Sequence, residues 1–301
     1  VVPWGYNFIF KIDRLRRIVN KVLGFHPNRT IPLLHKTTLR KWFAKHRSNA
    51  SGAETSGRRV ALFCDEFTNY NDVEVGQKMI LLLEALGYDV IMPEHVESGR
   101  TWLSKGLVRK AKALAIKNVS LLKDCVNVDV PIIGVEPSAI LTLRDEYPEL
   151  VPPDLLPAAK NLAKNTFLFE EWFAAEVEKG FIREEQFTAA TAKVFIHGHC
   201  HQKSLSSINF IKKSFAVLRN YQVAEIPSGC CGMAGSFGYE KEHYDVSMKI
   251  GELVLFPAIR RLDKTAIIAA SGTSCRHQVK DGTGRVGKHS AEILFEALKV
   301  E

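Results

Sequence analysis

Four of the six cysteines gather in the last third of the 301-residue chain, within three short motifs. Cys200 ends the stretch KVFIHGHC, Cys230 and Cys231 are adjacent in PSGCCGMAGSFG, and Cys275 lies in SGTSCRHQ. Each motif follows an apolar run of the kind that forms a buried strand. Thiolates are soft ligands that suit iron–sulfur clusters and zinc. We therefore expect these four residues to bind a metal centre.

Histidines and glycines crowd the same loops. The histidines are His197, His199, His201 and His277. Each is a candidate ligand, a hydrogen-bond donor behind the ligands, or an ordinary loop residue, and for each one singly a supporting or structural role is favoured. Gly232 and the glycines after it leave room for backbone amides to approach cluster sulfurs, which is one way in which a protein adjusts the potential of a cluster.

Other interpretations of the cysteines stay open. Their spacing does not choose between an iron–sulfur cluster and zinc, because they do not form CxxC pairs. The adjacent Cys230 and Cys231 are also compatible with inert thiols, a strained disulfide, or a catalytic thiol whose pKa is lowered by nearby histidines and amides. Cys125 lies outside the pattern and is interpreted as a small, buried apolar residue.

The elements that must position these residues alternate between strands and helices. Apolar runs at 60–64, 88–92 and 131–135 predict strands, and helical patterns cover about 73–86 and 104–122. Such alternation predicts an α/β fold, with a parallel sheet covered by helices on both faces. Sites in such sheets form at the carboxyl ends of the strands.

The strand pattern then repeats. KVFIHGHC matches RVALFCDE, VAEIP matches VIMPE, and AIIAASGTSC matches PIIGVEPSA, all at an offset of about 135 residues. We expect two duplicated, Rossmann-like lobes at 60–150 and 193–301, joined by a helical connector at 151–192. Of the cysteines in this pattern, the first lobe keeps only Cys64. The segment that aligns with Cys-Cys-Gly begins with Glu97, and Ala139 stands at the position that corresponds to Cys275. The first lobe is therefore expected to hold no cluster; Glu97 is an alternative hard ligand, but a surface role is favoured.

A basic arm precedes the lobes. Residues 1–47 contain 11 Lys and Arg against one acid, Asp13, whereas the whole chain has a net charge of +8. Apolar residues recur in the arm at helical spacing, with basic residues between them. The pattern is typical of a helix lying on a membrane surface or of one docked on a neighbouring domain, and docking is favoured. No nucleic-acid-binding motif is present, so nucleic acid is the weakest candidate partner.

Three further expectations concern the linker, the extent of the chain and its location in the cell. The small, polar residues of 48–59 predict a flexible linker. The chain begins at Val1, so it is expected to be a piece of a longer protein. It contains no run of eighteen apolar residues and no signal peptide, which favours a cytoplasmic location, at most peripheral at the inner face of the membrane.

The pattern C-x29-CCG-x42-C in a duplicated α/β frame resembles the cysteine-rich CCG domain family. This family includes the cysteine-rich subunit of heterodisulfide reductase and iron–sulfur subunits of glycolate, lactate and glycerol-3-phosphate oxidoreductases. HGHCHQKSL, SGCCGMAGSFGYEKEHYDVSMKIGE and SGTSCRHQVKDGTG are similar to one branch, in which a FAD-linked oxidase, a ferredoxin-type module and the CCG region share one chain. The resemblance covers about residues 60–301.

The resemblance implies an electron-transfer role in an oxidoreductase that acts on a 2-hydroxy acid such as D-lactate or glycolate. Electrons would pass from FAD in an upstream module, through [4Fe–4S] clusters, to a quinone or another acceptor. It also implies that Cys200, Cys230, Cys231 and Cys275 are the ligands, with partners in the flavin and ferredoxin-type modules. Arg276 and His277 follow Cys275 where the family closes with CxxC, which leaves one cysteine. One relay cluster therefore remains, or else a structural module with a zinc or empty site that docks the flavin domain or a membrane partner.

Overall fold

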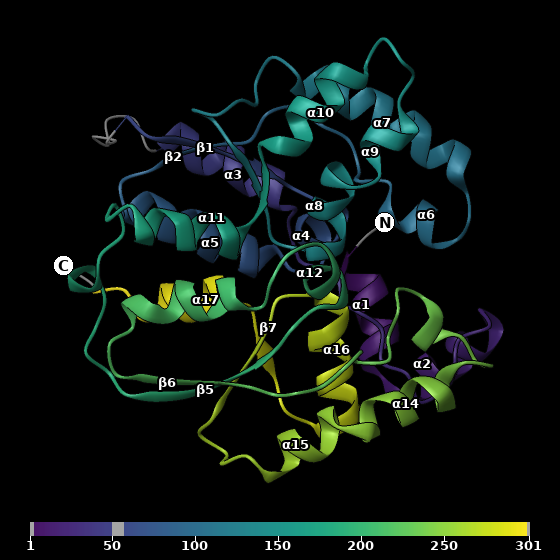
Figure 1. The fold of residues 1–301 in the computed structure, drawn as a ribbon. Coiled ribbons are helices and arrows are strands. Elements are labelled where there is room, and N and C mark those ends of the chain that lie inside the picture. The colour runs from purple at the N-terminus through teal and green to yellow at the C-terminus, as the bar shows by residue number, and fades with distance from the viewer. Residues whose placement is uncertain (1–2, 50–56, 300–301) are drawn as a thin grey trace.

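The computed structural model describes residues 3–49 and 57–299, and it confirms the predicted α/β fold (Figure 1). Two four-stranded sheets are present in the described residues, with the orders β2-β1-β3-β4 and β6-β5-β7-β8. All pairings in both sheets are parallel. The identical strand order is what an internal duplication predicts.

The first sheet and the helices around it come from residues 59–178. Its strands are β1 (Arg59–Phe63), β2 (Asp89–Ile91), β3 (Ile132–Gly134) and β4 (Thr166–Leu168). Its helices are α4 (Glu66–Tyr70), α5 (Val73–Ala85), α6 (Arg100–Ser104), α7 (Val108–Leu122), α8 (Pro137–Arg144), α9 (Tyr147–Leu150), α10 (Leu156–Lys164) and α11 (Phe169–Glu178).

The second sheet and its helices follow from residue 184 onward. The strands are β5 (Ala192–His197), β6 (Tyr221–Glu225), β7 (Ile267–Ala270) and β8 (Gly287–Lys288). The α-helices are α12 (Cys200–Leu205), α13 (Asn209–Ser214), α14 (Tyr244–Leu253), α15 (Leu255–Arg261), α16 (Thr273–Thr283) and α17 (Ser290–Glu296). Short 3-10 helices are η1 (Glu184–Gln186), η2 (Phe215–Val217) and η3 (Phe237–Tyr239).

The fourth strand of each sheet was not predicted from the sequence. The segment 151–192, expected to be a helical connector, also contributes β4 to the first sheet. β4 has three residues and β8 has two, so neither is long enough to produce a recognisable apolar period. In both lobes the following helix starts with the same cap: Leu168 N donates to Glu171 Oε2 at 2.8 Å, and His289 N donates to Glu292 Oε2 at 2.9 Å.

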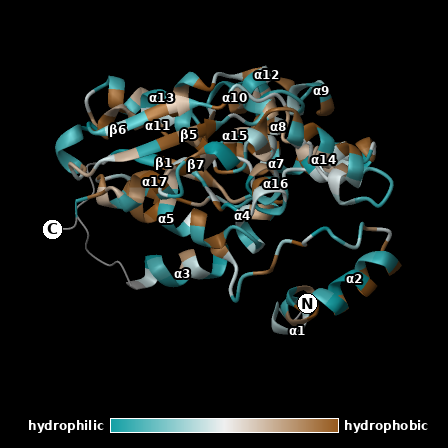
Figure 2. Cartoon of the chain, turned by 90° about the horizontal axis from the view of Figure 1, so that it is seen from below, coloured by the Kyte–Doolittle hydropathy of each residue, from teal (hydrophilic) through white to brown (hydrophobic). Residues whose placement is uncertain are grey.

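The helices after these fourth strands hold the two lobes together. α11 packs against α13 of the second lobe, while α17 packs against α5 of the first (Figure 2). Phe169 and Phe173 of α11 and Leu294 of α17 belong to one buried apolar cluster that spans both lobes. Between the lobes, buried Glu170 accepts hydrogen bonds from Ser271 Oγ at 2.5 Å and Ser290 Oγ at 2.6 Å. The lobes therefore share a core.

The N-terminal arm forms three helices: α1 (Pro3–Lys11), α2 (Asp13–Val22) and α3 (Leu39–Asn49). Figure 2 shows α1 and α2 at one edge of the molecule, connected to α3 by an extended segment. The arm docks on the lobes of this same chain through fully buried Arg29, whereas Val22 and Leu23, two of its apolar helical positions, stay exposed. Of the predicted linker 48–59, residues 50–56 lie outside the described residues. Among the helices that the structure describes, none is long and apolar enough to cross a membrane.

Two buried histidines make the fold sensitive to acid. Burial, followed by the charge of Arg276, lowers the pKa of His289 to about 3, and its Nε2 hydrogen-bonds to Val135 O. Burial and Arg40 lower the pKa of His95 to about 4. Because an unfolded histidine binds its proton near pH 6.5, the unfolded state takes up more protons as the pH falls from 6.5 toward 4. Each histidine thus contributes stability above pH 6.5 that is lost below it.

We therefore expect the free energy of unfolding to fall by about 2 kcal/mol for each of these two histidines between pH 7 and pH 5. Urea unfolding at the two pH values measures this difference. The variant His95→Gln has one fewer imidazole to protonate, so it should lose less stability over the same interval. An equal loss of stability in the wild-type protein and in His95→Gln would contradict the prediction.

Candidate metal centre

The four cysteines of the second lobe meet at the carboxyl edge of its sheet. Cys200 is the first residue of α12, just beyond β5, and Cys275 lies in the first turn of α16, beyond β7. Cys230 and Cys231 lie in the loop that follows β6. Parallel strands end at one edge of a sheet, so three separate segments bring their thiols together there.

The thiols form a row of interacting neighbours. Cys200 interacts with Cys230, Cys230 with Cys231, and Cys231 with Cys275. Cys231 and Cys275 are 3% and 1% exposed, whereas Cys200 and Cys230 are half-buried. The row therefore runs from a closed inner end to a more accessible outer end.

Hydrogen bonding along the row separates the pKa values of the thiols. Bonds from Cys200 and Cys231 hold the pKa of Cys230 well below its usual range, and a bond from Cys231 does the same for Cys275. The pKa values of Cys200 and Cys231 are raised, first by contact with the neighbouring thiols and then by burial. Two of the four sulfurs thus already have thiolate character, the form that binds metals.

Backbone amides of the loop after Cys231 point at the sulfurs. Gly232 N donates to Cys230 Sγ at 3.3 Å, and the amide of Met233 donates to Cys231. The loop achieves this through left-handed residues, with φ of +96° at Gly232, +43° at Ala234 and +66° at Gly235. Successive amides in such a turn form a concave site for negative charge. The room for amides expected from the glycines is present.

Gly232 permits no larger residue. A Cβ there would lie 2.2 Å from Ser247 O of α14, and its φ lies in the region that side chains rarely adopt. We expect Gly232→Ala to destabilise the protein by about 1–3 kcal/mol and to reduce its metal content, because the backbone of α14 cannot yield without moving the loop. Gly229→Ala in the same loop is the matched control, since a Cβ there meets nothing within 4 Å. Thermal unfolding and metal analysis compare the two; equal behaviour of both variants would disprove the prediction.

Lys203 ties two of the cysteine-bearing segments together. Its Nζ reaches from α12 to the loop after β6, where it donates to Ser228 O at 2.5 Å and to Gly229 O at 3.0 Å. Its charge also opposes the rise in the pKa of Cys200. Sequence reasoning did not single out Lys203, although it lies one helical turn after Cys200.

Two of the expected supporting histidines face the first lobe. His199 is the N-cap of α12, where its Nδ1 accepts a hydrogen bond from His201 N at 3.2 Å. Its Nε2 lies 3.8 Å from Glu136 Oε1. The Nε2 of His201 lies 3.3 Å from Nη1 of Arg100 in α6. Burial, His199 and Arg100 lower the pKa of His201 to about 4, so it is neutral at physiological pH.

The third expected supporting histidine, His277, contacts the arm. Its Nε2 lies 2.7 Å from Thr30 Oγ1 and 3.0 Å from Thr30 O. Thr30 Oγ1 also donates to Asp281 Oδ1 at 2.6 Å. Burial raises the pKa of Asp281, but the hydrogen bonds from His277 and Thr30 and the charge of Arg29 outweigh it and hold this pKa at about 2. His277 therefore belongs to the attachment of the arm.

The centre of that attachment is Arg29. Its guanidinium donates to Gly238 O at 2.8 Å, to Gln278 Oε1 at 2.7 Å and to Ser247 Oγ at 3.2 Å, and it pairs with Asp281 at 3.1 Å. Gln278 in turn donates to Ser247 O at 3.1 Å. The arm thus joins the loop after the cysteine pair to α14 and α16. Nothing in the residue pattern singled out this contact.

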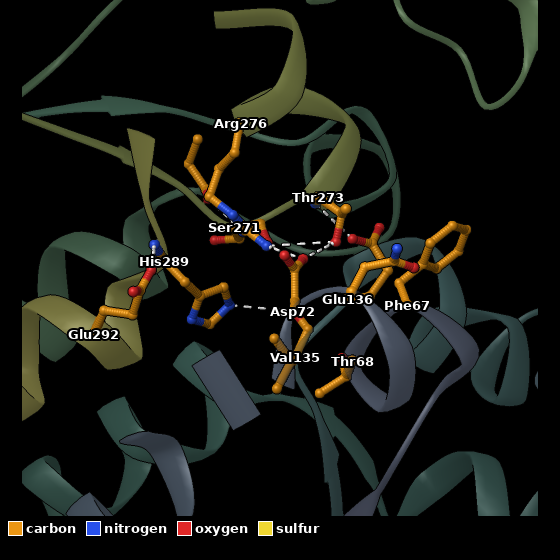
Figure 3. Close-up of polar contacts among 12 residues, drawn as sticks. Phe67, Thr68, Asp72, Val135, Glu136, Ser271, Thr273, Arg276, His289 and Glu292 are labelled. Atoms are coloured by element: carbon orange, nitrogen blue, oxygen red, sulfur yellow. Dashed lines mark hydrogen bonds and ion pairs between the residues drawn. The ribbon is translucent and has the colours of Figure 1, made fainter. Parts of the chain in front are cut away.

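Carboxylates of the first lobe hold the helix that carries Cys275 (Figure 3). Arg276 forms an ion pair with Asp72 at 2.5 Å and donates to Ser271 O at 2.6 Å. Thr273 N donates to Glu136 Oε2 at 2.7 Å. Asp72 ends the polar turn FTNYND, for which the sequence indicated no chemical role. The structure assigns it to the contact between the lobes.

The equivalent edge of the first sheet carries Cys64. Cys64 is 2% exposed, its Sγ donates to Asn69 Oδ1 at 3.6 Å, and burial raises its pKa to about 12. Glu97 is exposed, which supports a surface role, and Ala139 is fully buried. The prediction that Cys125 is buried is wrong, because the residue is exposed in the loop after α7. Within residues 3–49 and 57–299, no group of potential metal ligands gathers there.

Comparison with known proteins identifies relatives but no family model that matches the chain. D-2-hydroxyglutarate dehydrogenase from Escherichia coli is 27% identical over 308 aligned residues, which cover 99% of this chain and 29% of that protein. A subunit of the anaerobic glycerol-3-phosphate dehydrogenase from the same organism is 26% identical over 97% of this chain and 72% of its own length. Lactate utilization protein A of Bacillus subtilis is 25% identical over 78% of this chain and 98% of its own length.

The chain is therefore homologous to part of the first of these proteins and to most of the other two. It spans less than a third of the length of D-2-hydroxyglutarate dehydrogenase. Among solved structures, a hypothetical protein from Helicobacter pylori aligns with a TM-score of 0.49 and 13% identity, over 96% of this chain and 57% of that chain.

Proposed function

We propose that the second lobe binds one iron–sulfur cluster through Cys200, Cys230, Cys231 and Cys275, and that the chain relays electrons within a dehydrogenase. The observation that carries this proposal is the row of four neighbouring thiols at one sheet edge, with backbone amides directed at two of them. The donor set fits the cofactor, because soft sulfur ligands from separate segments and amide hydrogen bonds to sulfur are what such clusters use. When bound, a cluster accepts and releases single electrons. A [4Fe–4S] cluster is the type that four cysteines favour.

The residues around the thiols would prepare and protect the centre. The amides of Gly232 and Met233 stabilise negative charge on the sulfurs, as does the nearby ammonium group of Lys203. Hydrogen bonds to sulfur raise the reduction potential of a cluster by favouring its more negative state. Nearly complete burial of Cys231 and Cys275 keeps water from the inner sulfurs, while half-buried Cys200 and Cys230 give electrons a short path to the surface.

The substrate class is part of the proposal, and the names of the relatives support it. Two relatives are dehydrogenases of hydroxylated compounds or their subunits, and a third is named for lactate utilization. We infer that this chain receives electrons from a FAD-containing module, with or without a ferredoxin-type module between them. That flavin module would oxidise a 2-hydroxy acid of the D-lactate or glycolate type, and a quinone or another acceptor would take the electrons. With this role we expect a cytoplasmic location, with peripheral membrane contact through the arm.

An anaerobic redox titration tests the relay. The chain is reconstituted with iron and sulfide, reduced stepwise with dithionite, and followed by absorption and EPR spectroscopy. We expect reversible uptake of one electron per chain. A centre that keeps zinc, takes up no iron and cannot be reduced would instead show that the lobe is a structural module that docks its partner domains.

A further inference from the structure

His197 is a buried histidine whose ring faces the inner end of the thiol row. It is the last residue of β5 and is fully buried. One ring nitrogen of His197 and the sulfurs of Cys231 and Cys275 all lie within 4.8 Å of one another. This is the spacing of groups that share a metal centre.

The hydrogen bonds around His197 determine which nitrogen carries its proton. Nδ1 lies 2.7 Å from Ser228 Oγ, and that hydroxyl donates to Ile226 O at 3.3 Å. A serine hydroxyl has one hydrogen, so when it is donated to Ile226 the oxygen can only accept from the histidine. With the hydroxyl donated in this way, Nδ1 carries the proton and Nε2 presents a lone pair.

No N–H or O–H group of the described residues hydrogen-bonds to that lone pair. The sulfur of Cys275 contacts the His197 ring, and the sulfur of Cys231 lies close by. A buried nitrogen without a partner costs about 1–3 kcal/mol, so a thiol proton or a metal ion has to lie between the nitrogen and these sulfurs. A histidine whose other nitrogen donates to a fixed oxygen is also the usual arrangement of a metal-binding imidazole.

We propose that Nε2 of His197 is a ligand of the metal centre, on its buried side, next to Cys231 and Cys275. This inference rests on the proposed function, since it concerns the same centre. A neutral imidazole adds less negative charge to a cluster than a thiolate does, so its ligation raises the reduction potential. Ser228 is then a positioning residue, because it holds the ring in the tautomer that binds.

Nitrogen hyperfine spectroscopy of the reduced, reconstituted protein tests the ligand directly. We expect a strongly coupled nitrogen that changes its pattern when the protein contains ¹⁵N-labelled histidine. His197→Ala and His197→Cys should both remove this signal. His197→Cys supplies a thiolate in place of the imidazole, so it should retain the iron and show a lower midpoint potential. His243→Ala is the control and should keep the signal, because His243 is bound to Glu240 Oε2 at 2.8 Å.

The outcomes separate the two proposals. A reducible iron centre at full stoichiometry without a strongly coupled histidine nitrogen would overturn the role of His197 and leave the relay function standing. A centre that contains zinc and no iron would overturn the relay function. X-ray absorption at the zinc edge would then test the ligand on its own: a mixed shell of sulfur and nitrogen supports it, and a shell of sulfur alone refutes it.

Discussion

Cys231→Ser should abolish cluster binding, with iron falling from about four atoms per chain to less than one. Cys231 is the residue whose loss we expect to be most severe, because it bonds to both Cys230 and Cys275 and is 3% exposed. A serine hydroxyl is a poor ligand for the soft metals that bind at such a site. Iron and sulfide analysis after anaerobic reconstitution measures the effect.

The matched control is Cys64→Ser at the equivalent edge of the first lobe. Cys64 is 2% exposed, so both substitutions place a hydroxyl in a similarly buried position and both should cost about 1–3 kcal/mol of stability. Only Cys231→Ser should lose iron. Full iron content in that variant, or equal loss in both, would show that the thiol row is not the ligand set.

Arg29→Ala should cause the largest loss of stability among single substitutions in the arm, about 3–5 kcal/mol. The guanidinium is 0% exposed, and its removal leaves Asp281 without its ion pair and Gly238 O and Gln278 without a donor. Urea unfolding measures the loss. Since Gly238 and Ser247 adjoin the cysteine loop, metal uptake should also fall.

Arg17→Ala provides the comparison for this prediction. Arg17 lies on α2 and is about half exposed, paired only with Asp13, so its removal should cost at most about 1 kcal/mol. Arg29→Lys separates charge from shape: one ammonium cannot reach all the partners of a guanidinium, so most of the stability should still be lost. If Arg29→Ala and Arg17→Ala had similar stability, the arm would not be anchored by Arg29.

The sequence predicted the cysteine edge because strand-ending apolar runs directly precede each cysteine motif. The order of the first three strands in each lobe is repeated in the residues, and this made the duplication visible. β4 and β8 were missed, because two or three residues carry no period. Patterns of this kind predict structure only from residues that are close together in the sequence.

Contacts between segments that are far apart in the sequence could not be predicted from these patterns. Arg29 and Gln278 are 249 residues apart, and Asp72 and Arg276 are 204 apart. No spacing rule connects such pairs, although a lone acid that ends a polar turn and an arginine directly after a cysteine were both conspicuous. The role of His197 likewise depends on Ser228 and on the direction of one hydroxyl hydrogen, which only three-dimensional contacts reveal.

Whether the second lobe holds one iron–sulfur cluster is decided by the iron, acid-labile sulfide and zinc content of the anaerobically reconstituted chain, with EPR on the same sample. We predict about four irons and four sulfides per chain, and a paramagnetic signal in one redox state. One zinc per chain, with no stable uptake of iron or sulfide, would contradict the proposed relay.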